Sequence, residues 1–140
     1  MIRHAALVGG VDEVVAISSL AYWDWHGGAH PSARRAFHAR VGTAPGRAAL
    51  RAWGVRLPEE WEAPESPEDV VGKIAPTPIV IVHGRDDPLF SVDHAERLYD
   101  AAGDPKHLLI GDRFGHAEDG LTAGFAQRLT TLVLEELMPS

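Results

Sequence analysis

The sequence predicts an α/β fold with a parallel sheet of about three strands, and three observations support this. Short apolar runs occur at residues 14–17, 79–82 and 108–110. Each has the length and continuous apolar character of a strand that is covered on both faces. Helical patterns separate or follow these runs, and alternating strands and helices are typical of a parallel sheet with right-handed crossovers.

Three helices are expected around the strands. Residues 1–8 form an apolar-rich stretch that Gly9 and Gly10 would end. A second helix is expected over residues 91–102, with Ser91 as its N-cap and Gly103 as its terminator. The long final helix carries its apolar side chains on one stripe. That stripe consists of Leu121, Phe125, Leu129, Leu132, Val133 and Leu137.

The segment 20–75 interrupts the alternation of strands and helices. It predicts turns and short helices near residues 31–41, 45–53 and 66–74. The last of these opens with Ser66-Pro67-Glu68-Asp69, which has the pattern of a capping box with proline at the first helical position. The sequence therefore predicts a core formed by residues 1–19 and 76–140, with 20–75 inserted as a separate region.

Composition excludes several classes of protein. A chain of 140 residues is long enough for one domain with a core, and its net charge is −7. No basic stripe indicates a nucleic-acid partner, and no apolar run is long enough to span a membrane. The chain contains no cysteine, which excludes disulfides and thiolate chemistry. The N-terminus lacks the pattern of a signal peptide, so a cytoplasmic location is expected.

Asp87 follows the second predicted strand, in the stretch His83-Gly84-Arg85-Asp86-Asp87-Pro88. The carboxyl ends of parallel strands are where catalytic groups gather in α/β sheets. A carboxylate there could accept the Nδ1 proton of a histidine and fix its tautomer. The alternative is an ordinary turn, because Gly-Arg-Asp-Asp-Pro is also good turn chemistry.

His116 follows the third predicted strand, in Phe114-Gly115-His116-Ala117. Histidine suits general-base chemistry near neutral pH, and the alternative is a plain loop histidine. Both residues follow adjacent predicted parallel strands, in the order acid then histidine, so we expect them at the same edge of the sheet.

These motifs together resemble the C-terminal half of an α/β-hydrolase. Residues 14–18, 79–83 and 106–110 resemble the sixth, seventh and eighth strands of that family. Gly84 to Asp87 resembles its acid motif, and Gly115-His116 resembles its histidine motif. The resemblance implies a lid at 20–75 and a catalytic role for Asp87 and His116. It also implies that the Asp87 carboxylate and the His116 imidazole approach to about 3 Å.

The chain departs from that family at the nucleophile. Family members carry it in a Gly-x-Ser-x-Gly turn before the acid, and this sequence contains no such motif. Ser18 and Ser19 close the first predicted strand but lack flanking glycines and an oxyanion hole. If residues 1–7 end the helix that follows the turn, the nucleophile would stand about 5–10 residues before Met1.

Aromatic side chains are candidates for an apolar substrate pocket. These candidates are Trp23, Trp25, Trp53 and Phe90. The alternative is that the tryptophans pack the inserted segment against the sheet. No cofactor is expected, because the glycine pairs lack a phosphate-binding context. No metal site is expected either, because the nearby histidines are irregularly spaced. They are His26, His30 and His38.

The resemblance implies a serine hydrolase acting on an ester, thioester or amide of a small apolar molecule. The alternative is an inactive remnant that binds a partner or itself. The first predicted strand would lie at an open edge of the sheet, and such edges pair with other chains, so we expect self-association, with a dimer as one form.

Overall fold

A parallel sheet forms the centre of the fold, and the predicted fold class is confirmed. The computed structural model describes residues 1–22, 35, 38–56, 65–112, 114–120 and 122–137. Within them lie β1 (Val14–Ile17), β2 (Ile79–Gly84) and β3 (Lys106–Gly111), in the order β1-β2-β3. Both pairs of neighbouring strands are parallel.

The register brings the carboxyl ends of the strands to one edge of the sheet. Ile17 at the end of β1 lies opposite Val82 of β2, and Gly84 at the end of β2 lies opposite Gly111 of β3. One further backbone bond, from Ser18 N–H to Val82 O at 2.9 Å, extends the pairing past β1. The segments that follow the three strands therefore start close together.

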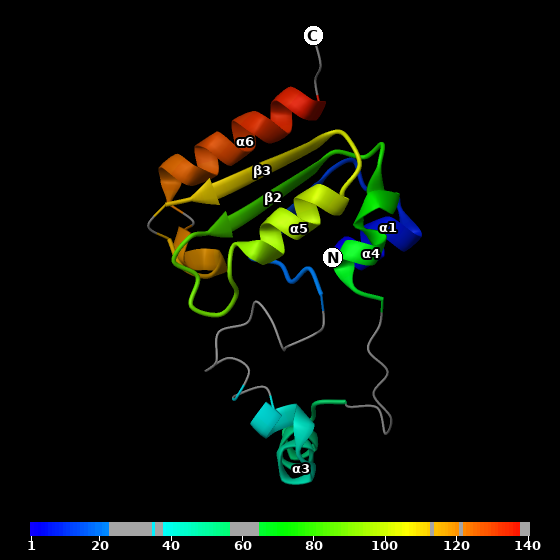
Figure 1. Ribbon diagram of the computed structural model, residues 1–140, viewed down its shortest axis with the longest axis vertical. Helices are drawn as coiled ribbons and strands as arrows, with labels where there is room; N and C mark the ends of the chain where they lie inside the picture. The colour runs from blue at the N-terminus through cyan, green and yellow to red at the C-terminus, as the bar shows by residue number, and fades with distance from the viewer. Residues whose placement is uncertain (23–34, 36–37, 57–64, 113, 121, 138–140) are drawn as a thin grey trace.

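Helices cover both faces of the sheet (Figure 1). Side chains from α1, η2 and α5 pack with β1 and β2 in one core cluster, and α6 packs on the opposite face. The elements on the first face are α1 (Ile2–Val8), α4 (Pro67–Val70), η2 (Val71–Ile74) and α5 (Asp93–Ala101). On the other face lies α6 (Ala123–Leu137), after the short helix η3 (Ala117–Gly120). This two-sided cover explains the continuous apolar runs.

The central strand β2 supplies much of the core. Ile79 and Ile81 point into the cluster under α5, whereas Val80 and Val82 point toward α6. All four are at most 1% exposed. Full burial of such side chains stabilises a fold by about 1.5–3 kcal/mol each. The most strongly buried strand is therefore the one that carries the acid loop at its end.

The expected helices at both ends of the chain form. α1 ends at Gly9 and Gly10, which have φ of 68° and 73° and thus adopt a conformation that favours glycine. Phe125 and Leu129 of the predicted stripe on α6 pack in the second core cluster. Ser91 does not act as the expected N-cap, because α5 begins after Val92 and has no side-chain cap.

The segment 20–75 contains helices and no strand among its described residues. These helices are η1 (His38–Gly42), α3 (Ala44–Ala52), α4 and η2. The predicted capping pattern forms at α4, where Asp69 Oδ2 accepts from Ser66 N–H at 3.1 Å. Val71 and Ile74 belong to the core cluster, so this end of the predicted lid range packs with the core. The rest of the core-and-lid division stays a prediction.

His94 is a buried polar residue on α5, with 1% of its surface exposed. Its Nδ1 accepts a hydrogen bond from Ala21 N–H at 3.2 Å, whereas its buried Nε2 has no hydrogen-bond partner among the residues that the structure describes. Burial lowers the pKa of His94 below its usual 6.5. Protonation of this imidazole would therefore place a charge in the core.

We expect the free energy of unfolding to fall as the pH is lowered below about 6.5. The unfolded chain binds a proton at His94 more readily than the folded chain, so stability is full above that pH and is lost toward the lowered folded pKa. Urea unfolding at pH 7.5 and pH 5.5 measures this effect. His94→Asn retains an acceptor for Ala21 but cannot titrate, so its stability should change less. An equal change in both proteins would contradict the assignment.

No helix in the described part of the chain is long and apolar enough to span a membrane.

Candidate active site

Asp87 lies in the loop that follows β2, with its carboxylate fully buried. One oxygen, Oδ1, accepts from the backbone N–H groups of Leu89 at 2.8 Å and Phe90 at 3.1 Å. Such a turn is typical of an aspartate that folds back on its own backbone. It fixes the carboxylate and leaves the second oxygen, Oδ2, directed elsewhere.

That second oxygen bonds His116. The distance between Asp87 Oδ2 and His116 Nδ1 is 2.8 Å, in agreement with the hydrogen bond expected from the sequence. The His116 side chain is 30% exposed, and its Nε2 has no hydrogen-bond partner among the described residues. Asp87 thus fixes the imidazole at Nδ1, whereas Nε2 is left without a partner within the described residues.

Two opposing effects act on the pKa of Asp87. Burial alone raises the pKa of this carboxyl, but hydrogen bonds from His116, Phe90 and Leu89 outweigh it, and the pKa lies below its usual value. Asp87 is therefore ionised at neutral pH. An ionised partner favours the Nδ1–H tautomer of His116 and stabilises the imidazolium when Nε2 takes a proton.

Backbone contacts fasten the acid loop to the histidine loop. Asp86 N–H donates to Phe114 O at 3.2 Å, and Arg85 N–H donates to Gly111 O at 3.0 Å. Gly84 lies so close to the carbonyl oxygens of Phe114 and Gly115 that a Cβ there would overlap them. Glycine at position 84 therefore permits the close approach that brings the two loops together.

Ser18 holds the histidine loop from the β1 side. Its Oγ accepts from Ala117 N–H at 2.9 Å, and the residue is 6% exposed. Both residues have positive φ, 46° at Ser18 and 43° at Ala117, which is uncommon outside glycine. Backbone strain of this kind gathers at functional sites. Ser18 therefore serves here as a buried acceptor that locates the residue next to His116.

The arrangement can accept a proton at His116 Nε2 and stabilise the charge that results. A hydroxyl or a water molecule placed at that nitrogen would be activated as a nucleophile. The described residues bring no serine hydroxyl into a hydrogen bond with His116 Nε2.

The structure places two of the four predicted pocket residues, and they lie in different surroundings. The ring of Phe90 lies 5.6 Å from the ring of His116, so it forms an apolar wall beside the imidazole. Trp53 follows α3 and is 82% exposed, because that helix has no buried residue to pack against. Its placement gives no support to a role in the pocket. Trp23 and Trp25 lie outside the described residues.

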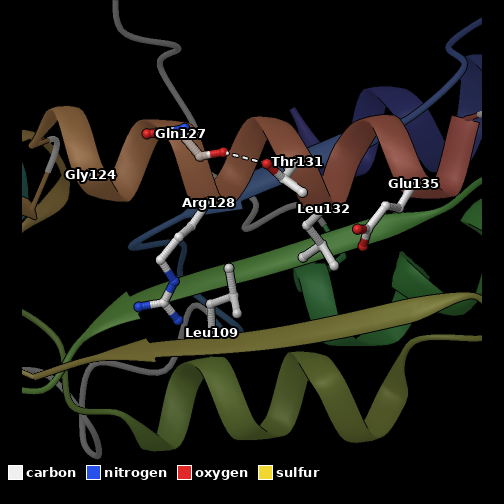
Figure 2. A pocket seen from close by; sticks show the side chains of 7 residues that line it. All are labelled: Leu109, Gly124, Gln127, Arg128, Thr131, Leu132 and Glu135. Atoms are coloured by element: carbon white, nitrogen blue, oxygen red, sulfur yellow. Dashed lines mark hydrogen bonds between the residues drawn. The ribbon is translucent and has the colours of Figure 1, made fainter.

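Two hollows in the described chain border β3. One, of about 390 Å³, lies between β3 and α6 (Figure 2). It is lined by Leu109, Gly124, Gln127, Arg128, Thr131, Leu132 and Glu135. A larger hollow of about 690 Å³ adjoins it near Asp119 and Phe125. Both border β3, and the larger one is also lined by Phe114, whose carbonyl accepts from Asp86 N–H at the candidate site.

No cluster of three or more histidine, aspartate or glutamate side chains suited to a metal ion occurs in the described ranges. Of the histidines considered as ligands, His38 lies in η1, whereas His26 and His30 fall outside those ranges.

Sequence reasoning missed two residues of the site. His83 is fully buried at the end of β2, with its Nε2 at 3.2 Å from Phe90 O and 3.7 Å from Asp87 Oδ2. The sequence feature that could have indicated a role for His83 is its position beside Gly84, at the end of an apolar strand. Ser18 was considered only as a nucleophile, and a contact to Ala117, 99 positions along the chain, leaves no local pattern.

Several solved structures are similar to this chain over nearly its whole length. The chain covers 58% of the alpha/beta hydrolase GrgF from Penicillium sp. sh18 with a TM-score of 0.57 and 18% identity. It covers 56% of the carboxylesterase CesB from Bacillus subtilis with a TM-score of 0.57 and 16% identity. The two matches include 97% and 99% of this chain, respectively. This chain has a partial α/β-hydrolase fold.

The partial α/β-hydrolase fold thus spans a little over half the length of these two solved structures. No protein-family model matches the chain. Among curated proteins, the uncharacterized protein YfhR from Escherichia coli strain K12 is 26% identical over 77 residues. That match includes 53% of this chain and 27% of YfhR.

Proposed function

We propose that this chain supplies the acid and the histidine of a serine-type hydrolase. The observation that carries the proposal is the 2.8 Å contact between buried Asp87 Oδ2 and His116 Nδ1 at the carboxyl edge of the sheet. The similar structures support it, since they include a carboxylesterase from Bacillus subtilis and a puromycin-hydrolyzing peptidase of Mycobacterium tuberculosis. The nucleophilic hydroxyl comes from residues beyond the 140 of this chain.

In the proposed reaction, His116 Nε2 takes the proton of that hydroxyl as its oxygen attacks the substrate carbonyl. Asp87 stabilises the resulting imidazolium, and His116 then gives the proton to the leaving group as the carbon–heteroatom bond breaks. Water attacks the acyl intermediate in a second cycle, in which the same nitrogen accepts and returns a proton. Each step needs an open Nε2 and a fixed Nδ1, which is the arrangement of His116.

The proposed substrate is an ester, thioester or amide of a small apolar molecule. The Phe90 ring beside His116 supports an apolar group near the reacting carbonyl. Trp23 and Trp25 stay predicted members of the same pocket.

Two measurements on esters test the proposal. The 140-residue chain by itself should not turn over p-nitrophenyl butyrate, because an acid and a base without a nucleophile leave only weakly assisted attack by water. The reading frame upstream of Met1 should encode Gly-x-Ser-x-Gly, and the extended protein should hydrolyse the ester and react with a fluorophosphonate. Serine-type turnover by the 140 residues alone, or an extended protein that is folded and inert, would contradict the proposal.

The second candidate function is an inactive remnant that self-associates. Within the described residues β1 has a strand neighbour on one side only. Apolar side chains near that edge are exposed, among them Val8 at 69% and Val11 at 38%. Open edges and apolar surface favour pairing with a second copy. Light scattering at micromolar concentration should show a dimer or larger species, and a lasting monomer would remove this candidate.

A further inference from the structure

His83 is a buried polar residue for which the proposed reaction has no role. It lies at the end of β2 and is 0% exposed. Its Nε2 lies 3.2 Å from Phe90 O and 3.7 Å from Asp87 Oδ2, and its Nδ1 has no hydrogen-bond partner in the described part of the chain. A buried imidazole with a single hydrogen bond costs free energy, so its contact with the acid loop needs an explanation.

The contacts define which ring nitrogen carries the hydrogen. Two oxygen acceptors lie near Nε2, whereas Nδ1 has no hydrogen-bond partner among the described residues. A hydrogen on Nε2 makes a bond to Phe90 O, while a hydrogen on Nδ1 would be buried without an acceptor and would leave the Nε2 lone pair against two oxygens. His83 therefore donates from Nε2.

That donor closes the turn that holds the catalytic carboxylate. Phe90 is bound on both sides, because its N–H donates to Asp87 Oδ1 at 3.1 Å and its carbonyl accepts from His83. With Oδ1 held inside the turn, Oδ2 is left to face His116. The Phe90 ring, also located by this turn, lies against the His116 ring.

We propose that His83 is a positioning residue for Asp87, acting through the carbonyl of Phe90. The contact of Nε2 with Asp87 Oδ2 is longer than a hydrogen bond, so it adds a favourable dipole next to the negative oxygen rather than a competing donor. His116 thus keeps Oδ2 as its own acceptor. The inference rests on the proposed function for its catalytic meaning, but the geometry that it describes exists without a nucleophile.

Three substitutions at His83 distinguish the effect of the Nε2 hydrogen-bond donor from the effect of side-chain size. His83→Gln places an amide N–H near the position of Nε2. His83→Met has nearly the same length and volume as glutamine but no donor. His83→Asn keeps a buried amide that is too short to reach Phe90 O. The pair Gln and Met is therefore matched in size, and the pair Gln and Asn is matched in polarity.

The readouts are taken by NMR on the 140-residue chain. They are the carboxyl pKa of Asp87, followed through its ¹³C signal, and the low-field proton of the His116 Nδ1–H bond to Asp87. In His83→Gln both should match the wild type. In His83→Met and His83→Asn the Asp87 pKa should rise and the low-field proton should be lost, because the turn no longer holds the carboxylate.

Unchanged readouts in a folded His83→Met or His83→Asn would overturn the proposal, and so would a His83→Gln variant that is perturbed or unfolded. If either His83→Met or His83→Asn, the two variants with no donor to Phe90 O, fails to fold, the other is compared with His83→Gln. Failure of the proposed function is distinguishable, because it appears as an inert extended protein and leaves these NMR signals unaltered.

Discussion

If a segment upstream of Met1 supplies the nucleophile as proposed, Asp87→Asn should lower kcat for ester hydrolysis by that longer protein about 10⁴-fold. Asparagine at this position would present either an amide oxygen with no charge or an N–H group to His116 Nδ1. Both lose the ion that stabilises the imidazolium, and the second favours the tautomer that cannot accept a proton at Nε2. The KM should change little, because the carboxylate is fully buried and has no direct access to substrate.

The matched control is Asp86→Asn, at the exposed neighbouring aspartate. Only the backbone N–H of Asp86 is tied into the site, through Phe114 O, so the substitution leaves that bond in place. Its kcat should stay within a few-fold of the wild type. Equal losses in the two variants, or a loss of less than about tenfold in Asp87→Asn, would show that the charge at position 87 does not support the reaction.

Gly84→Ala should destabilise the 140-residue chain by about 3 kcal/mol. The new Cβ would overlap the carbonyl oxygens of Phe114 and Gly115, and a backbone carbonyl cannot turn aside as a flexible side chain can. Relief requires the acid loop and the histidine loop to move apart, so the low-field proton between Asp87 and His116 should be lost as well. Urea unfolding and NMR measure the two effects.

Gly124→Ala provides the control for this substitution. Gly124 lies in the first turn of α6, and a Cβ there would meet nothing within 4 Å. Alanine is the better helix former, so this variant should be unchanged or more stable by up to about 1 kcal/mol. A Gly84→Ala protein as stable as Gly124→Ala would mean that the two loops are not held at close contact.

The fold could be predicted from the sequence because its signals are local. The run at residues 79–82 is apolar without interruption, and a strand buried on both faces needs that composition. The meeting of Asp87 and His116 was also predictable, since parallel strands end at the same edge of a sheet. Their spacing of one strand–helix–strand unit then leaves little choice of topology.

The residues that could not be predicted depend on distant partners. His83 acquires its role only when the loop after β2 turns Phe90 O back toward it. Ser18 depends on a bond to Ala117 between segments that start on different strands. The packing of Val71 and Ile74 against the core was missed because an amphipathic helix shows which face is buried but not which neighbour buries it.

The parallel pairing of β1 with β2 affects which part of the chain can change in length during evolution. The register from Val14–Ile79 to Ile17–Val82 ties the two strands directly to each other, so the long stretch of chain between them closes a loop whose ends are already fixed. Each doubling of the length of such a loop raises the free-energy cost of closing it by only about 0.6 kcal/mol. Insertions and deletions in this stretch therefore cost little folding stability, while Asp87 and His116 keep their geometry at the sheet edge. Selection can therefore change the length of this stretch without rebuilding the site itself.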